Sequence, residues 1–272
     1  MKYKTLLSAV LAVAALNIGE AKAVNEDITS PMYLPNEMET LSETSLAYQR
    51  TKFEDYGAKE DLIARETLTF GIGEYTSIWA GIGNRFNTKG ATNQDYNNNH
   101  NFDYELGLKR NARLFNDLLM QVGVSYYTFS PRSWYGHSGE AKDKIRDVKG
   151  NTRWYKALRG DVKLATELEN GLMPYASFGV DGNIDDSDRD LYYTAFAGIH
   201  KLENNFAYDA GLRYEFQFGS DDVSAWYMQG SADYFLNDRM TLGAYLDYQF
   251  ADSSYREVDY GYTTELRFKV LF

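Results

Sequence analysis

The chain has 272 residues and a formal net charge of −11, with 23 tyrosines, 15 phenylalanines and 22 glycines but only four prolines and no cysteine. The acidic balance argues against a nucleic-acid-binding protein, which needs a basic face, and the lack of cysteine excludes disulfide staples and a lipoprotein anchor. Beyond the N-terminal segment, no stretch approaches the ~18 apolar residues of a transmembrane helix, and no long stretch shows helical periodicity.

The first 23 residues have the pattern of a secretory signal peptide. Lys2 and Lys4 give a positive start, residues 6–18 are almost wholly apolar, and Ala21 and Ala23 supply the small residues that a signal peptidase reads. This apolar stretch is too short for a spanning helix. We therefore expect export across the inner membrane and cleavage near Ala23.

Residues 24–42 form a separate acidic segment that carries Pro31 and Pro35 and shows no strand pattern. Two interpretations stay open. The segment is either a disordered periplasmic tail or a plug that folds up into the domain that follows, residues 43–272.

Strict alternation of apolar and polar residues is the main signal in that domain. From Phe206, one face carries Tyr208, Leu212 and Phe216, whereas the other face carries Arg213 and similar polar residues. A strand directs successive side chains to opposite faces, so the segment has one apolar and one charged surface. Such segments run for about nine to 13 residues, which suits a tilted strand crossing a bilayer, whereas strands of soluble sandwiches are usually nearer five or six. A secreted soluble β-protein is the alternative.

The pattern predicts an all-β fold, a transmembrane antiparallel up-and-down β-barrel of about 12 strands. The predicted strands cover residues 43–53, 61–72, 77–87, 101–111, 117–129, 152–167, 172–181, 190–201, 206–218, 223–235, 240–251 and 258–272. An even number places both termini on the same, periplasmic side, and the short and long connections alternate as such barrels require. The first strand has the weakest pattern, so ten strands is the competing prediction.

The final strand ends in an aromatic residue and has aromatic or aliphatic residues at alternate positions. It resembles the recognition signal that the outer-membrane barrel assembly machinery reads. The residues that carry this resemblance are Tyr262, Leu266, Phe268, Val270 and Phe272. In size and strand number the chain is also similar to the small monomeric twelve-stranded porins, such as those for acidic oligosaccharides, although no diagnostic motif of that group is matched.

The polar faces of the strands predict a lumen lined by equal numbers of acidic and basic residues. The predicted lumen-lining residues are Arg65, Asp103, Glu105, Lys109, Arg159, Asp161, Lys163, Asp209, Arg213, Glu215, Asp247, Glu265, Arg267 and Lys269. Two hypotheses follow: a narrow channel for small polar solutes, or a lumen that these charges plug by pairing across it. The balance of charge weakens the case for an anionic sugar as the solute.

No convincing catalytic set surrounds His100, His137 or His200, so we expect no enzymatic activity. The acidic loop at residues 185–190 lacks the spacing of a Ca²⁺ site, and no metal or cofactor is expected. The basic loop at residues 130–151 is expected to be solvated, with binding of lipopolysaccharide phosphates or inward folding as alternatives.

The leading hypothesis is a porin-like passive channel in the bacterial outer membrane. The expected partners are outer-membrane lipid and lipopolysaccharide, the barrel assembly machinery and small polar solutes. A closed-lumen structural or surface-interaction barrel is the alternative, with outer loops that contact a host, a phage or lipid. An outer-membrane hydrolase is a distant third.

Overall fold

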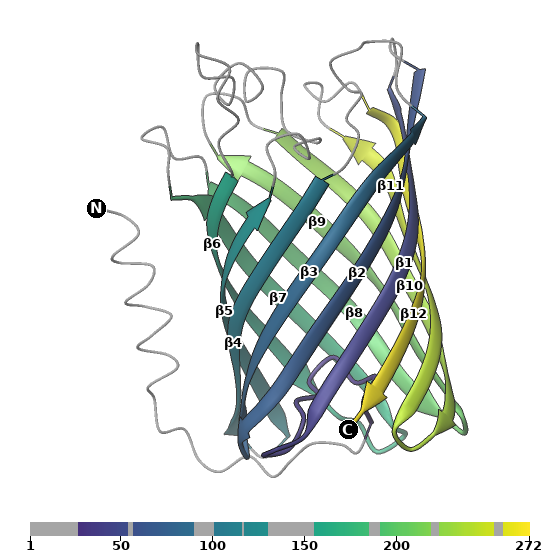
Figure 1. The fold of residues 1–272 in the computed structure, drawn as a ribbon. Helices are drawn as coiled ribbons and strands as arrows, with labels where there is room; N and C mark the ends of the chain where they lie inside the picture. Colours follow the sequence, from purple (N-terminus) through teal and green to yellow (C-terminus); the bar gives the residue numbers. More distant parts are fainter. Residues whose placement is uncertain are drawn as a thin grey trace.

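The computed structural model describes residues 27–53, 57–89, 101–115, 117–129, 155–184, 191–218, 223–252 and 258–272. Within these residues the chain forms one closed barrel of twelve antiparallel strands (Figure 1). The strands are β1 (Thr40–Phe53), β2 (Gly57–Gly73), β3 (Thr76–Lys89), β4 (Asn101–Phe115), β5 (Leu118–Phe129), β6 (Tyr155–Thr166), β7 (Leu172–Asn183), β8 (Leu191–Glu203), β9 (Phe206–Phe218), β10 (Val223–Asn237), β11 (Met240–Asp252) and β12 (Val258–Leu271).

Each strand pairs with its neighbours in sequence, and β1 pairs with β12 to close the barrel. This confirms the predicted up-and-down topology and the twelve-strand count over the ten-strand alternative. The first strand is longer than predicted, because Leu41 and Ser42 already pair with Leu271 and Val270 of β12. No helix among the described residues is long and apolar enough to cross a membrane.

One end of the barrel carries tight turns. The first strand, β1, begins at this end, and the last strand, β12, finishes there. Glu74 and Tyr75 alone connect β2 to β3, and Asn204 with Asn205 connect β8 to β9. Asn204 adopts a φ of 54°, a left-handed conformation that asparagine tolerates better than most residues and that tight hairpins require. We call this the turn end, and the opposite end of the barrel the loop end.

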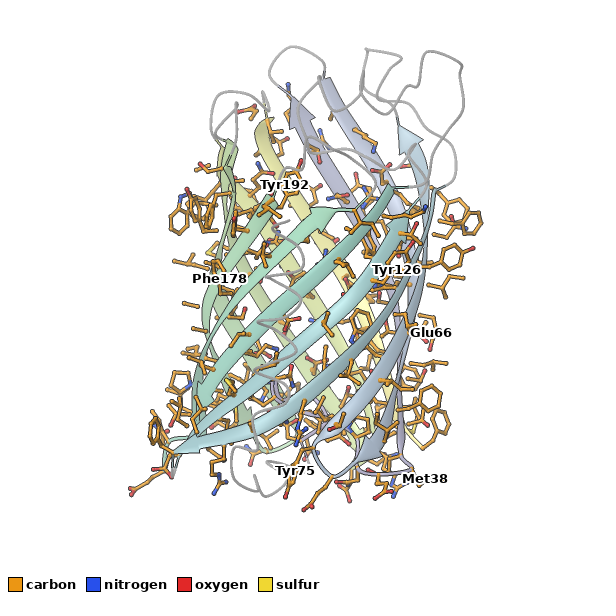
Figure 2. The ribbon with its side chains drawn as sticks, turned by 90° about the vertical axis from the view of Figure 1, so that its left-hand side faces the viewer. Met38, Glu66, Tyr75, Tyr126, Phe178 and Tyr192 are labelled. Atoms are coloured by element: carbon orange, nitrogen blue, oxygen red, sulfur yellow. The ribbon has the colours of Figure 1, made fainter. Side chains whose placement is uncertain are left out.

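The outer surface of the barrel is apolar. On β9, Tyr208 and Leu212 are exposed, whereas Ala207, which directly precedes Tyr208, is fully buried. Leu106 on β4 and Leu266 on β12 each leave 61% of their surface exposed. Figure 2 shows side chains projecting all along the outer wall. A soluble β-protein buries its apolar face in a core, so this arrangement is the inverse of a sandwich.

A polar cluster on β1 and β2 interrupts the apolar outer surface. The Glu66 carboxylate lies on the outside of the wall (Figure 2) and accepts hydrogen bonds from the hydroxyls of Ser42, at 2.6 Å, and Thr44. These two donors offset part of the cost of placing a carboxylate among apolar groups.

Candidate functional site in the barrel lumen

The inner face of the wall is polar, and the predicted lumen residues lie on it. On β2, β4, β6, β9, β11 and β12 they alternate with outward apolar residues such as Leu106 and Leu212. Because side chains alternate between the two faces of a strand, the register of each strand decides which of its side chains point into the lumen. The lumen has three levels: the turn end, a middle layer of ion pairs and a cavity near the loop end.

At the turn end, residues 27–35 lie inside the barrel, and the exposed residues 36–38 lead from them towards β1. Ile28 is only 2% exposed and Met32 is fully buried, where it packs against Leu119, Ala165 and Met173 on the inner wall. In Figure 1 this segment is the purple trace inside the lower end of the barrel. The described part of the acidic segment therefore packs against the inner wall of the barrel. We call residues 27–39 the inserted segment.

The backbone of the inserted segment is hydrogen-bonded to the barrel wall. Lys163 on β6 donates to the carbonyl oxygen of Pro31 at 2.7 Å, and Asn111 on β4 donates to that of Met32 at 2.8 Å. Closer to β1, the backbone N–H of Gly71 donates to the Glu39 carbonyl at 3.0 Å. Buried backbone groups need hydrogen-bond partners. The inserted segment obtains these partners from the barrel wall.

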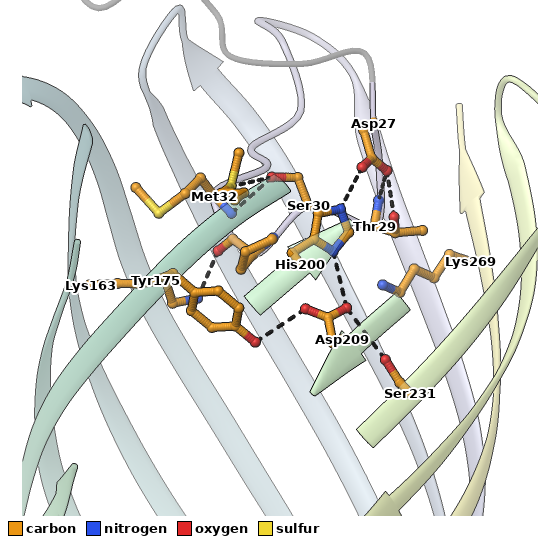
Figure 3. Close-up of polar contacts among 12 residues, drawn as sticks. Asp27, Thr29, Ser30, Met32, Lys163, Tyr175, His200, Asp209, Ser231 and Lys269 are labelled. Atoms are coloured by element: carbon orange, nitrogen blue, oxygen red, sulfur yellow. Dashed lines mark hydrogen bonds and ion pairs between the residues drawn. The ribbon is translucent and has the colours of Figure 1, made fainter. Parts of the chain in front are cut away.

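A buried histidine links the inserted segment to the wall. The Nε2 atom of His200 lies 2.8 Å from the Asp27 carboxylate, and its Nδ1 atom lies 3.1 Å from the Asp209 carboxylate (Figure 3). An ionised carboxylate only accepts hydrogen bonds, so a ring between two carboxylates donates from both nitrogens and is an imidazolium. The backbone N–H of Thr29 completes the network by donating to Asp27 at 2.8 Å.

These contacts set the charge of Asp27. Burial alone would raise the pKa of its carboxyl, but hydrogen bonds from His200 and Thr29 outweigh burial and hold the pKa below the ordinary value of 3.8. The carboxylate form is therefore the one that the docked segment binds best. The other charged groups around this network include Asp233, Lys163 and Lys269 on the surrounding strands.

We expect acid to release the inserted segment. Because the pKa of Asp27 is depressed in the docked state, the stabilisation is fully present above pH 3.8 and is lost as the pH falls through the docked value. Hydrogen exchange of the backbone amides of residues 28–33, followed from pH 7 to pH 3, should show this loss of protection. Asp27→Asn is the control: its segment should exchange faster at pH 7, since a charge-assisted hydrogen bond contributes roughly 1.5–3 kcal/mol. Identical pH profiles for the two proteins would contradict the role of Asp27.

The middle layer of the lumen holds a chain of ion pairs that links residues of four strands. Arg65 on β2 contacts Glu105 on β4 at 2.6 Å and Asp103 at 3.5 Å. Arg159 on β6 contacts the same Glu105 at 3.5 Å and Asp181 on β7 at 3.3 Å. Glu105 thus joins two arginines, and the chain lies along the inner wall.

A second group of ion pairs lines the opposite part of the wall. Arg213 on β9 contacts Asp247 on β11 at 2.7 Å and Glu215 at 3.3 Å, and Arg267 on β12 contacts Glu265 at 3.5 Å. Both groups of ion pairs bring together charges that were predicted only to share the lumen, except for Asp181, which the sequence analysis did not single out.

The remaining predicted lumen residues have other neighbours. Lys269 pairs with Glu43 at 3.7 Å, Lys109 lies 5.2 Å from the centre of the Trp79 ring, and Asp161 lies over Gly123. Lys163 contacts the inserted segment directly, and Asp209 contacts His200, which binds that segment.

Several lumen residues were not singled out from the sequence. Asp27 and Glu43 lie in the N-terminal part, which has a weak pattern, and Lys59, Asp61 and Arg85 lie near the loop ends of β2 and β3. Lys59 lies just before the predicted strand 61–72, whereas Glu43, Asp61 and Arg85 lie within predicted strands and were not listed among the lumen residues. His200 is on the inner wall at the turn end, as predicted, but its carboxylate partners were not foreseen.

Near the loop end, the lumen contains a cavity of about 240 Å³. Most of the residues that line it are polar, including Lys59, Arg85, Glu215, Tyr227 and Asp247. It lies at the opposite end of the lumen from the inserted segment.

Other predicted features lie outside the described residues: His100, His137, the acidic positions 185–190 and the basic loop. Among the residues that the structure describes, no group of three or more His, Asp or Glu side chains is arranged to hold a metal ion.

Comparisons with solved structures identify the fold. The chain is similar to the COG4313 outer membrane channel from Pseudomonas putida F1, with a TM-score of 0.62 and 13% identity over 90% of this chain and 99% of that one. It is also similar to the NanC porin, with a TM-score of 0.55 and 10% identity over 84% and 98% of the two chains. LpxR from Salmonella typhimurium gives a TM-score of 0.50 and 11% identity over 84% and 99%.

The sequence matches no protein-family model and no curated protein. At these identities the structural likeness identifies the fold alone. That fold is a closed antiparallel β-barrel of twelve strands, similar to those of outer-membrane proteins, as the alternation predicted.

Proposed function

We propose that this protein is a porin-like passive channel of the bacterial outer membrane for small polar solutes, closed at its turn end by the inserted segment. The observation that carries the proposal is a closed barrel whose inner face is polar and holds a cavity of about 240 Å³. A purely structural barrel would need no such space. The likeness to proteins named as a channel and a porin supports the same function.

The setting follows from the surface of the barrel. An apolar outer wall needs lipid around it, and barrels of this kind place tight turns and both termini in the periplasm. We therefore assign the turn end to the periplasm and propose that the signal peptide is removed near Ala23. Outer-membrane lipid and lipopolysaccharide would then surround the wall.

A specific observation favours a second candidate, the closed-lumen structural or surface-interaction barrel. The inserted segment packs in the lumen at the turn end, and Arg65, Glu105 and Arg159 pair within the lumen. In that case solutes would not pass, and outer loops would carry the function.

Electrical recording from the refolded protein in planar bilayers separates the two candidates. A channel gives stepwise currents above the empty bilayer, and the steps become larger or more frequent when residues 25–38 are deleted. If neither the full chain nor this deletion conducts, the proposal is wrong and the structural barrel replaces it. The prediction that the protein is not an enzyme is tested in parallel by mass spectrometry of lipid and peptide substrates.

We expect Phe272 to be needed for assembly in cells but not for refolding. Its side chain is 67% exposed, while its backbone pairs with Thr40 across the closing seam at 2.8 and 3.2 Å. Phe272→Ala keeps those backbone bonds and should reduce the barrel to a minor fraction in cells, measured by heat-modifiable migration, with unchanged refolding in detergent. Tyr208→Ala, which removes another outward aromatic residue near the turn end, is the matched control. Equal loss in both variants would show that Phe272 carries no assembly signal.

A further inference from the structure

The cavity near the loop end has walls of opposite net charge. It is bounded by residues of β1, β2 and β3 on one side and of β9, β10, β11 and β12 on the other. In the cyclic order of the strands, β3 and β9 lie half-way round the barrel from each other. Side chains from these two strands therefore approach the cavity from opposite walls.

The wall formed by β2 and β3 carries a net positive charge. Lys59 and Asp61 form a buried pair at 2.8 Å, and Arg85 lies 3.6 Å from the same carboxylate. Two cations thus share one anion. Arg85 is the more accessible of the two cations, since 25% of its side chain is exposed compared with 4% for Lys59.

The wall formed by β9 and β11 carries a net negative charge. Arg213 contacts both Asp247 and Glu215, so two anions share one cation. The guanidinium also lies over the ring of Tyr227, 4.1 Å from its centre, in a cation–π contact that fixes its position. One oxygen of Asp247, Oδ1, is buried without a hydrogen-bond partner. The Asp247 side chain lines the cavity together with Glu215.

We propose that this cavity binds small zwitterionic solutes of the α-amino acid class, with the carboxylate toward Arg85 and the ammonium group toward Glu215 and Asp247. This proposal rests on the proposed channel function and names the solutes that the channel admits. The two walls together are neutral, so a solute with one net charge gains at one wall and is repelled at the other. At about 30 Å³ for each water molecule, the cavity of about 240 Å³ has space for a small solute.

The affinity of the detergent-refolded protein for L-glutamine, measured by ligand-observed NMR titration, tests the proposal. Two analogues serve as comparisons: one lacks the amino group and is an anion, and the other lacks the carboxyl group and is a cation. We expect L-glutamine to bind roughly tenfold more tightly than either analogue, which corresponds to about 1.4 kcal/mol. Equal binding of all three solutes, or no binding of L-glutamine, overturns the proposal.

Two substitutions assign the ends of the solute. Arg85→Gln should weaken binding of L-glutamine and of the anionic analogue, and Glu215→Gln should weaken binding of L-glutamine and of the cationic analogue, each by roughly threefold to tenfold. Asp61 keeps Lys59 and Arg213 keeps Asp247 in these variants, so both should fold. Glu60→Gln is the matched control, because Glu60 pairs with Arg50 on the outer face at a similar height.

An effect of Glu60→Gln equal to that of Glu215→Gln would overturn the proposal, since a general change of charge would then explain the result. Bilayer currents distinguish a failure of the solute assignment from a failure of the channel function. Conduction without selective binding removes the solute assignment and leaves the channel function, whereas selective binding without conduction supports the site and rejects the channel.

Discussion

Deleting residues 25–38 is expected to raise the single-channel conductance by about threefold or more, because twelve strands enclose a wider interior than the side-chain-filled interior of eight. The inserted segment is the main occupant of the turn end. Its residues Ile28 and Met32 are buried against the wall, and its backbone accepts hydrogen bonds from Lys163 and Asn111. The deletion exposes these wall groups to water, which can solvate them.

The control for this deletion is Asp27→Asn, which keeps the segment and weakens only its contact with His200. It should give the wild-type conductance for most of the time, with brief openings to the larger value. Heat-modifiable migration and circular dichroism establish that both variants form the barrel. Unchanged conductance in a correctly folded deletion would show that the segment does not obstruct the passage.

The sequence was sufficient to predict the barrel because the period of a strand is read directly from alternating residue types. From Phe206 to Phe218 every second side chain is apolar, and β9 has these bounds in the structure. Prediction was less accurate where the pattern is mixed. The outward residues of β1 include Ser42 and Thr44, whose hydroxyls bind the outward Glu66, so the start of this strand at Thr40 was missed.

The site was predictable only in part, because alternation gives the face of a residue but not its partner. Arg65 and Glu105 are 40 positions apart in sequence and meet across the intervening strand β3. Asp27 and His200 are separated by 173 positions. Such contacts depend on the register of all the strands and on the path of a segment without periodicity. Composition could therefore predict a balanced lumen, but not which charges pair within it.

Gly71→Ala is expected to displace the inserted segment without removing any of it. A Cβ atom at Gly71 would overlap the backbone of Pro35 and Asn36, whereas a Cβ atom at Gly73, on the same strand, would have no heavy atom within 4 Å. The backbone of the segment has to move to relieve this overlap, because no flexible side chain can yield. Overpacking of this kind costs typically about 1–3 kcal/mol, so the undocked population should rise by roughly fivefold to 150-fold.

Gly73→Ala is therefore the matched control, with the same added methyl group two residues away. Gly71→Ala should show faster hydrogen exchange in residues 28–33 and a larger mean conductance, and Gly73→Ala should show neither. The chain length and the charges are unchanged in both variants. A difference in conductance between them therefore reports the position of the segment and not its composition. If Gly71→Ala exposes the segment to exchange but leaves the conductance unchanged, the passage is closed by the ion pairs of the middle layer. If exchange is also unchanged, the contact between Gly71 and the segment is not the one that holds it in the lumen.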